Sequence, residues 1–338
     1  MKLAVFAFTR RGCETARRAA GAMEYDCCRM FTMEKFGQPD FESYRPPLAA
    51  FMEPIFRWAD TIVFVGSTGM AVRAIAPWVR DKKTDPGVIV VDEAGSFVIS
   101  LLSGHIGGAN METRVLAQAL GAVSVITTAT DVNGRFSVDD WAARQQVTIG
   151  SMASAKAVSA AILEQDVPLK CDFPIATPLP NGVQLGNTGE VGIYIGWREK
   201  APFASTLRLI PRCLNLGIGC RKGTPEDKIE AAVAAVLGQH GVPLTAIAKA
   251  VSIDLKAEEP GLLDFCQHHR IPAVFYTAEQ LNAVPGNFPA SGFVSSITGV
   301  DNVCQRAAML DAERCIIEKT AMDGVTVAVA EIKWEARF

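Results

Sequence analysis

The segment Ile99–Asn110 reads Ile-Ser-Leu-Leu-Ser-Gly-His-Ile-Gly-Gly-Ala-Asn, a pattern that predicts a strand running through a turn into a helix. Asn110 stands where a helix N-cap belongs, ahead of the amphipathic run Met111–Leu120. Glycines let a ligand approach the backbone, and the start of a helix favours a negatively charged group. We therefore expect the turn to point N–H groups at a ligand beside His105, a titratable base. A plain connection with a surface histidine fits the pattern equally well.

On both sides of this junction, apolar runs alternate with helical patterns, which predicts an open α/β sheet over residues 1–138. Strands are expected at Leu3–Phe8, Cys27–Phe31, Thr61–Val65, Val88–Asp92, Phe97–Leu101 and Val123–Thr127, and helices after Gly12 and at Leu48–Trp58, Met70–Val79 and Met111–Leu120. Three of the strands end in polar residues, which are Ser67 and Thr68, Asp92 and Glu93, and Thr128 and Asp131. Because ligands of open α/β sheets bind beyond the carboxyl ends of strands, we expect these residues to form one cleft with His105.

Residues 139–211 predict a small α+β middle domain. A helix is expected at Met152–Glu164, and the proline- and glycine-rich stretch Val167–Gly196 that follows contains expected hairpin strands at Val183–Leu185 and Val191–Ile195. Residues 212–338 predict a C-terminal α/β domain. Its first strand, Leu214–Ile218, leads into the loop 219–223, and Thr224 and Pro225 are the expected N-cap and first residue of the next helix.

An element is expected at Ile247–Ile253. Further strands are expected at Ala273–Tyr276 and Val325–Ala330, and further helices at Gly261–His268, Ala278–Val284 and Asn302–Ala312. Cys220 precedes a helix start beside two cations, which would lower its thiol pKa, although a small residue in a tight turn explains it more simply.

Composition excludes several classes of protein. The 338 residues are 49% hydrophobic and 20% charged, a globular balance, and the formal net charge of −3 provides no basic field for nucleic acid. Nine cysteines without a C-x-x-C pair favour a reduced, cytoplasmic protein. We expect no signal peptide, because Arg10 and Arg11 follow the first apolar run too soon, and no membrane partner, because no apolar run approaches ~18 residues.

Known motifs give little sign of cofactor chemistry. Gly217, Gly219 and Gly223 miss the dinucleotide-binding spacing by one residue, and neither the P-loop pattern nor G-x-S-x-G occurs. His268 and His269 are neighbours on a predicted helix and would point about 100° apart, a poor arrangement for a metal. The sequence therefore predicts neither a nucleotide nor a metal cofactor.

Five runs are distinctive in combination: Gly66–Arg73, Ser100–Asn110, Val125–Asp131, Gly217–Thr224 and Gly324–Ala330. With these runs, in the same order and across nearly its whole length, the chain resembles the cobalamin-biosynthesis protein CbiG family. The glycine-histidine-glycine turn together with the run Gly-Ile-Gly-Cys-Arg makes the resemblance specific, and the middle section contributes little to it.

The resemblance implies cobalt-precorrin-5A hydrolase activity in the anaerobic route to vitamin B12. That reaction opens the δ-lactone on ring A of the macrocycle and releases acetaldehyde, giving cobalt-precorrin-5B. It needs water and acid–base groups only, so no cofactor is expected, and the cobalt is carried by the corrinoid substrate. Neighbouring pathway enzymes and a second copy of the chain stay open as partners.

Roles within the site are our own assignment. His105 is the expected base and the amides of Gly107 and Gly108 the oxyanion donors, with Ser103 as a competing covalent nucleophile and Asp92 or Asp131 as the group that orients the histidine. Arginine suits the carboxylates of the macrocycle, whereas Lys256 and Lys319 are better explained as solvated surface lysines. The full expected set of substrate contacts is Ser67, Thr68, Gly69, Arg73, Gly104, Gly107, Gly108, Asn110, Thr128, Gly219, Cys220, Arg221, Lys222, Gly223 and Thr224.

Two other functions fit the same residues. A non-catalytic corrinoid-binding scaffold of the pathway would bind tightly without turnover. A general anion-binding α/β enzyme would be stabilised by a nucleotide or a sugar phosphate rather than by a corrinoid.

Overall fold

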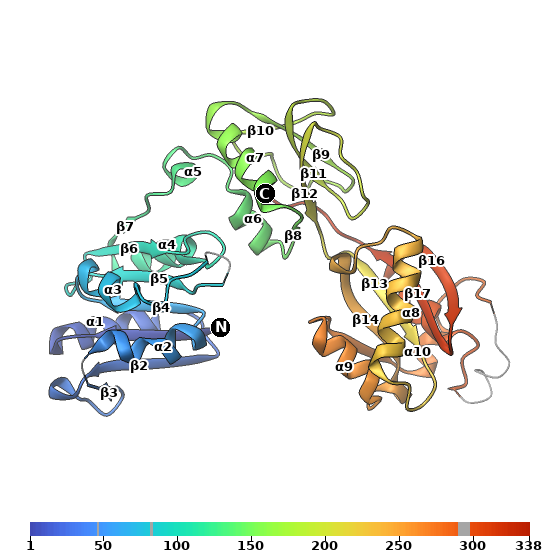
Figure 1. Ribbon diagram of the computed structural model, residues 1–338, viewed down its shortest axis with the longest axis horizontal. Coiled ribbons are helices and arrows are strands. Elements are labelled where there is room, and N and C mark those ends of the chain that lie inside the picture. The colour runs from blue at the N-terminus through green and yellow to red at the C-terminus, as the bar shows by residue number, and fades with distance from the viewer. Residues whose placement is uncertain (46, 82–83, 290–297) are drawn as a thin grey trace. The chain divides into compact units, whose positions relative to one another are not determined.

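Three β-sheets with helices packed on them organise the chain, as the computed structural model shows for residues 1–45, 47–81, 84–289 and 298–338 (Figure 1). The α/β prediction is confirmed. Two compact units divide the chain, Met1–Ala143 with one sheet and Arg144–Phe338 with two. The finer division of the second unit at residues 211 and 212 stays a prediction. Among the described residues, no helix combines the length and the apolarity needed to cross a membrane.

The sheet of the first unit has seven strands, and the last two in sheet order run opposite to the other five. In sheet order the strands are β3 (Glu42–Tyr44), β2 (Cys27–Met33), β1 (Lys2–Ala7), β4 (Thr61–Val65), β5 (Gly87–Val91), β6 (Phe97–Leu102) and β7 (Val123–Val125). Neighbours are parallel from β3 through β5, β6 is antiparallel to β5, and β7 is parallel to β6. The carboxyl ends of β6 and β7 therefore lie at the edge where β5 begins.

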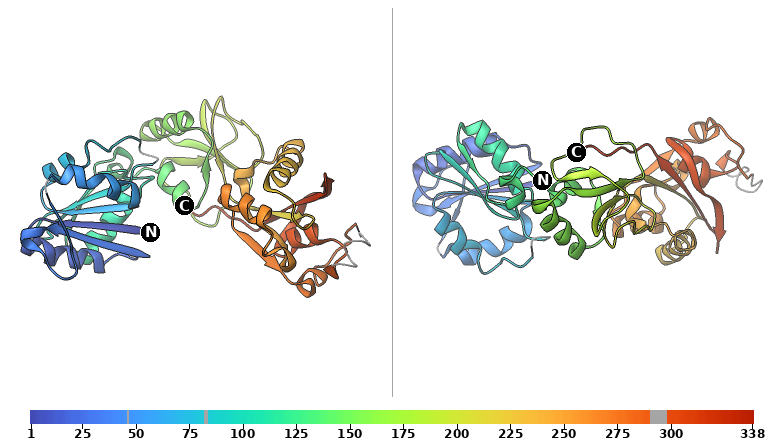
Figure 2. Two further views of the ribbon diagram at one scale, coloured as in Figure 1. Left: turned by 60° about the horizontal axis from the view of Figure 1, so that its bottom comes forward. Right: turned by 90° about the horizontal axis from the view of Figure 1, so that it is seen from above.

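Helices cover both faces of this sheet, which is why its central strands are apolar at nearly every position (Figure 2). On one face α1 (Arg10–Gly21) and α4 (Ala109–Leu120) pack against Leu3 and Val5. On the other, α2 (Leu48–Trp58) and α3 (Thr68–Ile75) pack against Ala4 and Phe6. The remaining helices of this part are η1 (Glu34–Phe36), α5 (Ala129–Val132) and α6 (Val138–Arg144).

The first sheet of the second unit is mostly parallel. Its order is β10 (Val183–Leu185), β9 (Val167–Cys171), β11 (Val191–Ile195), β12 (Ser205–Ile210) and β8 (Thr148–Ile149), and α7 (Met152–Glu164) packs on it. The predicted hairpin of β10 and β11 is wrong, because both strands pair in parallel with β9, which lies between them.

The second sheet of this unit is covered on both faces. Its order is β15 (Ala273–Tyr276), β14 (Ile247–Ile253), β13 (Leu214–Gly219), β17 (Val325–Ile332) and β16 (Ala312–Met322). The helices are α8 (Glu226–Gln239), η2 (Leu244–Ala246), η3 (Asp254–Lys256), α9 (Pro260–His268), α10 (Ala278–Asn282) and α12 (Val303–Met309). Residues of α8 and α9 share one core with β13 and β17, and residues of α12 share another with β14 and β17.

Two local predictions in this part are wrong. Pro225, in extended backbone, is the N-cap of α8, and the hydroxyl of Thr224 instead donates to the carbonyl of Arg221 at 2.8 Å. The strand β16 has no predicted counterpart. It is an edge strand that pairs with β17 through several register shifts, so its apolar residues do not alternate regularly.

The last residues of the chain return from β17 to the first sheet of this unit. Trp197 donates its indole N–H to Oε2 of Glu331 at 2.6 Å, and the ring of Phe173 packs edge-on against Trp334. A backbone bridge joins Ile175 to Ala336. These contacts tie the two sheets of the second unit together.

Candidate functional site

The loop between β6 and α4 folds tightly over the start of the helix, and its glycines are there for steric reasons. A Cβ on Gly104 would lie 2.5 Å from Oδ1 of Asn110, and a Cβ on Gly107 would lie 2.5 Å from Cβ of Ser103. Gly108 has φ of 77°, a left-handed conformation that glycine adopts without strain. The loop therefore has one compact shape that places His105 at its tip.

Carbonyl groups of the loop accept hydrogen bonds from three backbone N–H groups around the start of the helix. The amide of Gly108 donates to the carbonyl of His105 at 2.9 Å, that of Ala109 to Ser103 at 3.3 Å, and that of Asn110 to Gly104 at 2.8 Å. Gly108 is the N-cap, and Asn110 lies inside the first turn, so the predicted N-cap is wrong. The expected oxyanion donor on Gly108 is also wrong, because its N–H is already used.

His105 is paired with Asp131, across 26 residues of sequence. Nε2 of the imidazole lies 3.0 Å from Oδ2 of the carboxylate, and the two side chains are 21% and 14% exposed. Asp131 sits on the short helix α5, which begins beyond the end of β7, next to the loop that follows β6. Of the two carboxylates considered for orienting His105, the structure places Asp131 there.

Four donors converge on the carboxylate of Asp131. The hydroxyl of Thr128 lies 2.5 Å from Oδ2 and the side-chain amide of Asn110 lies 3.0 Å from the same oxygen, while Arg114 pairs with Oδ1. Burial disfavours the charged carboxylate, but the hydrogen bonds from Thr128, His105 and Arg114 outweigh it and lower the pKa of Asp131 to about 2. Asp131 is therefore a permanent anion at neutral pH.

Asn110 forms hydrogen bonds with three other side chains of this network. Its side chain is buried, with the residue 2% exposed, and its amide nitrogen donates both to Asp131 and to the hydroxyl of Thr128 at 3.0 Å. Ser100 on β6 donates to Oδ1 of Asn110 at 2.7 Å, which fixes the orientation of the amide. A chain of hydrogen bonds from the sheet to His105 holds the imidazole in place.

Ser103 is poorly placed to be a nucleophile. Its φ is 54°, unusual for a residue other than glycine, and its hydroxyl is buried without a hydrogen-bond partner among the described residues. A hydroxyl that solvent does not reach would not reach the carbonyl of a large macrocycle either. The geometry favours His105 over Ser103 as the reacting group.

A second set of expected site residues lies at the opposite edge of the sheet. Ser67, Thr68, Gly69 and Arg73 follow β4, and Asp92 follows β5, whereas His105 and Asp131 follow β6 and β7, which run the other way. The expected single cleft is wrong for that reason.

The side chain of Asp92 stabilises the turn between β5 and β6. Its carboxylate accepts backbone N–H groups from Ala94 at 3.2 Å and from Ser96 and Phe97 at 2.6 Å each. Arg73 donates to the carbonyl of Gly69 at 3.4 Å, within its own helix. These residues take part in the fold of that edge, opposite the edge that carries the His105 loop.

A cavity of about 520 Å³ opens in the second unit, where β13 and β14 end. Its wall is largely apolar, with Ile253, Val303 and Val325, and the loop of Gly219 and Cys220 forms one side. Four cations line it: Arg221, Lys222, Lys256 and Lys319. Lys256 and Lys319 were expected on the solvated surface, and the cavity corrects that expectation.

The charges around this cavity are unevenly paired. Lys256 lies 2.9 Å from Glu259, which also accepts the backbone N–H of Gly223 and so anchors the loop. Within the described ranges, no acidic side chain forms an ion pair with Arg221, Lys222 or Lys319. The cavity therefore combines an apolar wall with positive charge that a ligand carboxylate can neutralise.

For Cys220 in this wall, the structure excludes the less favoured alternative of a lowered thiol pKa. Burial raises the pKa of its thiol and exceeds the opposing effect of Lys256. The helix α8 begins only at Glu226, too far along the chain for its N-terminus to stabilise a thiolate. Cys220 is a neutral part of the cavity wall.

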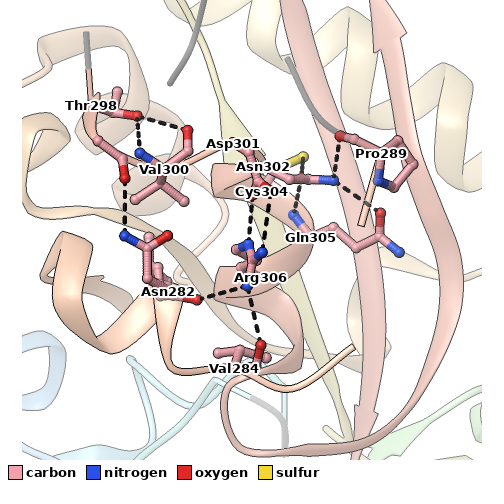
Figure 3. A network of polar contacts seen from close by, with 12 residues as sticks. Asn282, Val284, Pro289, Thr298, Val300, Asp301, Asn302, Cys304, Gln305 and Arg306 are labelled. Carbon is pink, nitrogen blue, oxygen red and sulfur yellow. Dashed lines mark hydrogen bonds and ion pairs between the residues drawn. The ribbon is translucent and has the colours of Figure 1, made fainter. Parts of the chain in front are cut away.

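A polar network behind the cavity holds the start of α12, whose Val303 lines the wall (Figure 3). Asn302 is buried and caps the helix by accepting the N–H of Gln305 at 3.1 Å. Arg306 pairs with Asp301 at 2.7 Å and donates to the carbonyls of Leu281 and Val284. The wall is thus rigidly attached to α10.

Sequence reasoning missed Ser100 and Arg114 in the His105 network and Glu259 beside the cavity. Arg114 lies four residues after Asn110 on the same helix, so the i, i+4 spacing places both on one face. That signal could have found Arg114. Ser100 and Glu259 meet their partners only through the packing of distant segments, and no local pattern marks them.

Comparisons with known proteins agree with this architecture. Two family models match, Cobalamin synthesis G N-terminal over residues 50–131 and Cobalamin synthesis G C-terminus over residues 214–330. A cobalt-precorrin-5A hydrolase of Salmonella typhimurium is 34% identical, covering 97% of this chain and 97% of that protein, and one of Priestia megaterium is 30% identical, covering 98% and 95%.

Among solved structures, a Sulfolobus solfataricus protein described as a cobalamin biosynthesis protein G homologue aligns over 98% of this chain and 97% of that one, at 18% identity and a TM-score of 0.42. The family models and the two nearly full-length relatives decide the assignment. The chain belongs to the cobalamin synthesis G family, CbiG, of cobalamin biosynthesis.

Proposed function

We propose that this protein is a cobalt-precorrin-5A hydrolase, which opens the ring-A δ-lactone of its corrinoid substrate and releases acetaldehyde to give cobalt-precorrin-5B. The observation that carries the proposal is the pair of His105 and Asp131, 3.0 Å apart, which lies inside the region matched by the N-terminal family model. The names of the two nearly full-length relatives support the same reaction.

The pairing with Asp131 determines which nitrogen of His105 is reactive. A carboxylate that stays ionised accepts a hydrogen bond, so Nε2 carries the proton and Nδ1 of the neutral ring is left as the base. Asp131 also stabilises the imidazolium that forms when Nδ1 takes a proton. His105 can therefore act as a base and then return the proton as an acid.

The chemistry needs one water and three proton transfers at His105, and the new carboxylic acid releases its own proton to solvent. Water adds to the lactone carbonyl while its proton passes to Nδ1 of His105, and the N–H of Gly107 is the remaining candidate donor to the oxyanion. The acyl C–O bond breaks, and the leaving oxygen takes the proton from His105, which leaves a carboxylate and a hydroxyl. His105, neutral again, then takes the hydroxyl proton, which allows the neighbouring C–C bond to break. The aldehyde forms, and the electron pair passes into the conjugated macrocycle.

The cavity of the second unit is proposed to hold acidic side chains of the same substrate. Its volume of about 520 Å³ suits an edge of a macrocycle, and its apolar wall with Arg221, Lys222 and Lys319 suits carboxylates carried on an apolar ring.

We expect the purified protein to release acetaldehyde from the lactone substrate without any added cofactor. Incubation in ¹⁸O-labelled water should place one solvent oxygen in the new carboxylate, because water attacks the acyl carbon. Both products can be followed by mass spectrometry under anaerobic conditions. Tight corrinoid binding without acetaldehyde would overturn the hydrolase proposal and favour a scaffold. If sugar phosphates stabilise the protein and the corrinoid does not, a general anion-binding enzyme would be favoured.

Replacing both Arg221 and Lys222 with alanine should raise KM about 10-fold at low salt with little change in kcat, because two partly exposed charges each contribute at most about 1 kcal/mol. The effect should shrink as salt is added, since ions screen exposed charges. Steady-state rates at two ionic strengths measure it. Arg212→Ala, in the same unit but outside the lining of the cavity, is the control. A KM that is unchanged at low salt would remove the cavity from the substrate site.

A further inference from the structure

Two glutamates and two histidines meet where α8 packs against α9, outside the lining of the cavity. Glu226 and Glu230 are one helical turn apart on α8 and so share a face. His268 is the last residue of α9 and His269 follows it. The carboxylates and imidazoles of four residues from two helices are thereby brought together.

The spacing of their atoms suits a metal ion. Nδ1 of His268 lies 3.0 Å from Oε1 of Glu226, and Nε2 of His269 lies 3.3 Å from Oε1 of Glu230. One ligand atom each from Glu226, Glu230 and His268 fall within 4.8 Å of one another. A tetrahedral ion with bonds of about 2.0–2.2 Å to nitrogen and oxygen holds its ligands about 3.4 Å apart. Small side-chain rotations would bring these three donors to that spacing, and Nε2 of His269 already lies 3.3 Å from Oε1 of Glu230.

The structure overturns the expectation that the two imidazoles diverge. The helix ends at His268, and His269 adopts φ of −85° and ψ of 1°, so the 100° step of a continuing helix does not apply. The two rings stack with centroids 5.1 Å apart and 12° between their planes, and both reach acidic residues of α8. The adjacent histidines thus act from the same side.

A partner for this cluster is indicated by its charge and by one buried atom. Nε2 of His269 is shielded from solvent, and its 3.3 Å approach to Oε1 of Glu230 does not have the geometry of a hydrogen bond. The two carboxylates bring two negative charges to the cluster, which a divalent cation would neutralise. A bound ion would satisfy the buried nitrogen as well.

We propose that Glu226, Glu230, His268 and His269 bind one divalent transition-metal ion of the class that imidazole and carboxylate hold together, such as Zn²⁺, Co²⁺ or Ni²⁺. The ion would clamp the first turns of α8 to the end of α9. Both helices adjoin the loop that lines the cavity, since α8 follows Thr224 and Glu259 before α9 accepts the N–H of Gly223. The role is structural, and the hydrolytic chemistry does not depend on it.

The test uses the full-length chain without a histidine tag and titrates it with Co²⁺ by calorimetry and visible spectroscopy. We expect one equivalent to bind, and Tm to rise by about 3–8 °C at 100-fold excess over Kd. His268→Gln and Glu230→Gln should each weaken binding at least 10-fold and remove the rise in Tm. His240→Gln is the matched control, because His240 lies at the far end of α8 and should bind as the wild type does.

Three outcomes would overturn the proposal. One is wild-type protein that binds no Co²⁺ at millimolar concentration, and another is His268→Gln and Glu230→Gln that bind as tightly as the wild type. The third is a cobalt–thiolate absorption band, which would show that cysteines such as the exposed Cys27 and Cys28 are the ligands in place of the cluster. None of these outcomes bears on acetaldehyde release, so the two proposals fail separately.

Discussion

His105→Ala is expected to lower kcat by about 10²–10⁴-fold, the usual contribution of a positioned acid–base group, while KM changes little. The imidazole would take the proton of the attacking water and return it to the leaving oxygen, and no other side chain in the loop can do both. The loop itself should keep its shape, because Gly104, Gly107 and Asn110 determine it through contacts that do not involve the imidazole. Single-turnover rates of acetaldehyde release, with corrinoid binding measured separately, check the result.

Two variants make this test sharper. His105→Asn keeps a polar side chain that can still bond to Asp131 but cannot take up a proton, so it should be as slow as His105→Ala. His240→Ala removes a histidine of the second unit and should react at the normal rate. A His105→Asn protein with near-normal turnover would show that the loop binds substrate without catalysing the reaction.

The strands and helices of the first unit could be predicted from the sequence because its central strands are buried on both faces. Thr61–Val65 is apolar apart from its first residue and was predicted with the bounds that β4 has. Direction was harder, since β5 and β6 both look like strands of a parallel sheet. The reversal depends on a tight turn in which Asp92 accepts three backbone N–H groups and Gly95 takes φ of 70°. The run Asp-Glu-Ala-Gly at residues 92–95 is typical of such a turn, whereas from the sequence alone its acidic residues are interpreted as ligand-binding residues at the end of a strand.

The candidate site was predictable in its parts but not in its pairing. His105 stands out as a base in a glycine turn, and Asp92 and Asp131 were equally available from the sequence. Only the strand directions decide between them, because they put Asp92 at one edge of the sheet and Asp131 at the other. Lys256 and Lys319 illustrate the same limit, since a lysine in a cavity and a lysine in solvent have the same local pattern.

Asp131→Asn should lower kcat by about 10²–10⁴-fold even though His105 is present, because an amide cannot stabilise the imidazolium and favours the wrong tautomer. The substitution also places an NH₂ group among the four donors that Asp131 accepts, so donor would face donor near Asn110 or Arg114. Rates of acetaldehyde release measure the loss. Arg114→Gln is the control, because its half-exposed side chain pairs with the other oxygen and its removal should cost less than about 10-fold.

The pH dependence of stability separates this network from a merely steric defect. The pKa of Asp131 is about 2 in the folded protein, below the ~3.9 of an unfolded aspartate, so its contribution is present above pH 4 and is lost as pH falls toward 2. Only the charged form is favoured, by on the order of 1–2 kcal/mol after allowance for partial exposure. Wild type should therefore have a higher Tm than Asp131→Asn at pH 6, and the gap should narrow steadily toward pH 3. A gap that does not change with pH would mean that the carboxylate is not held as an anion by Thr128, His105 and Arg114, and the assignment of Nδ1 of His105 as the base would fall with it.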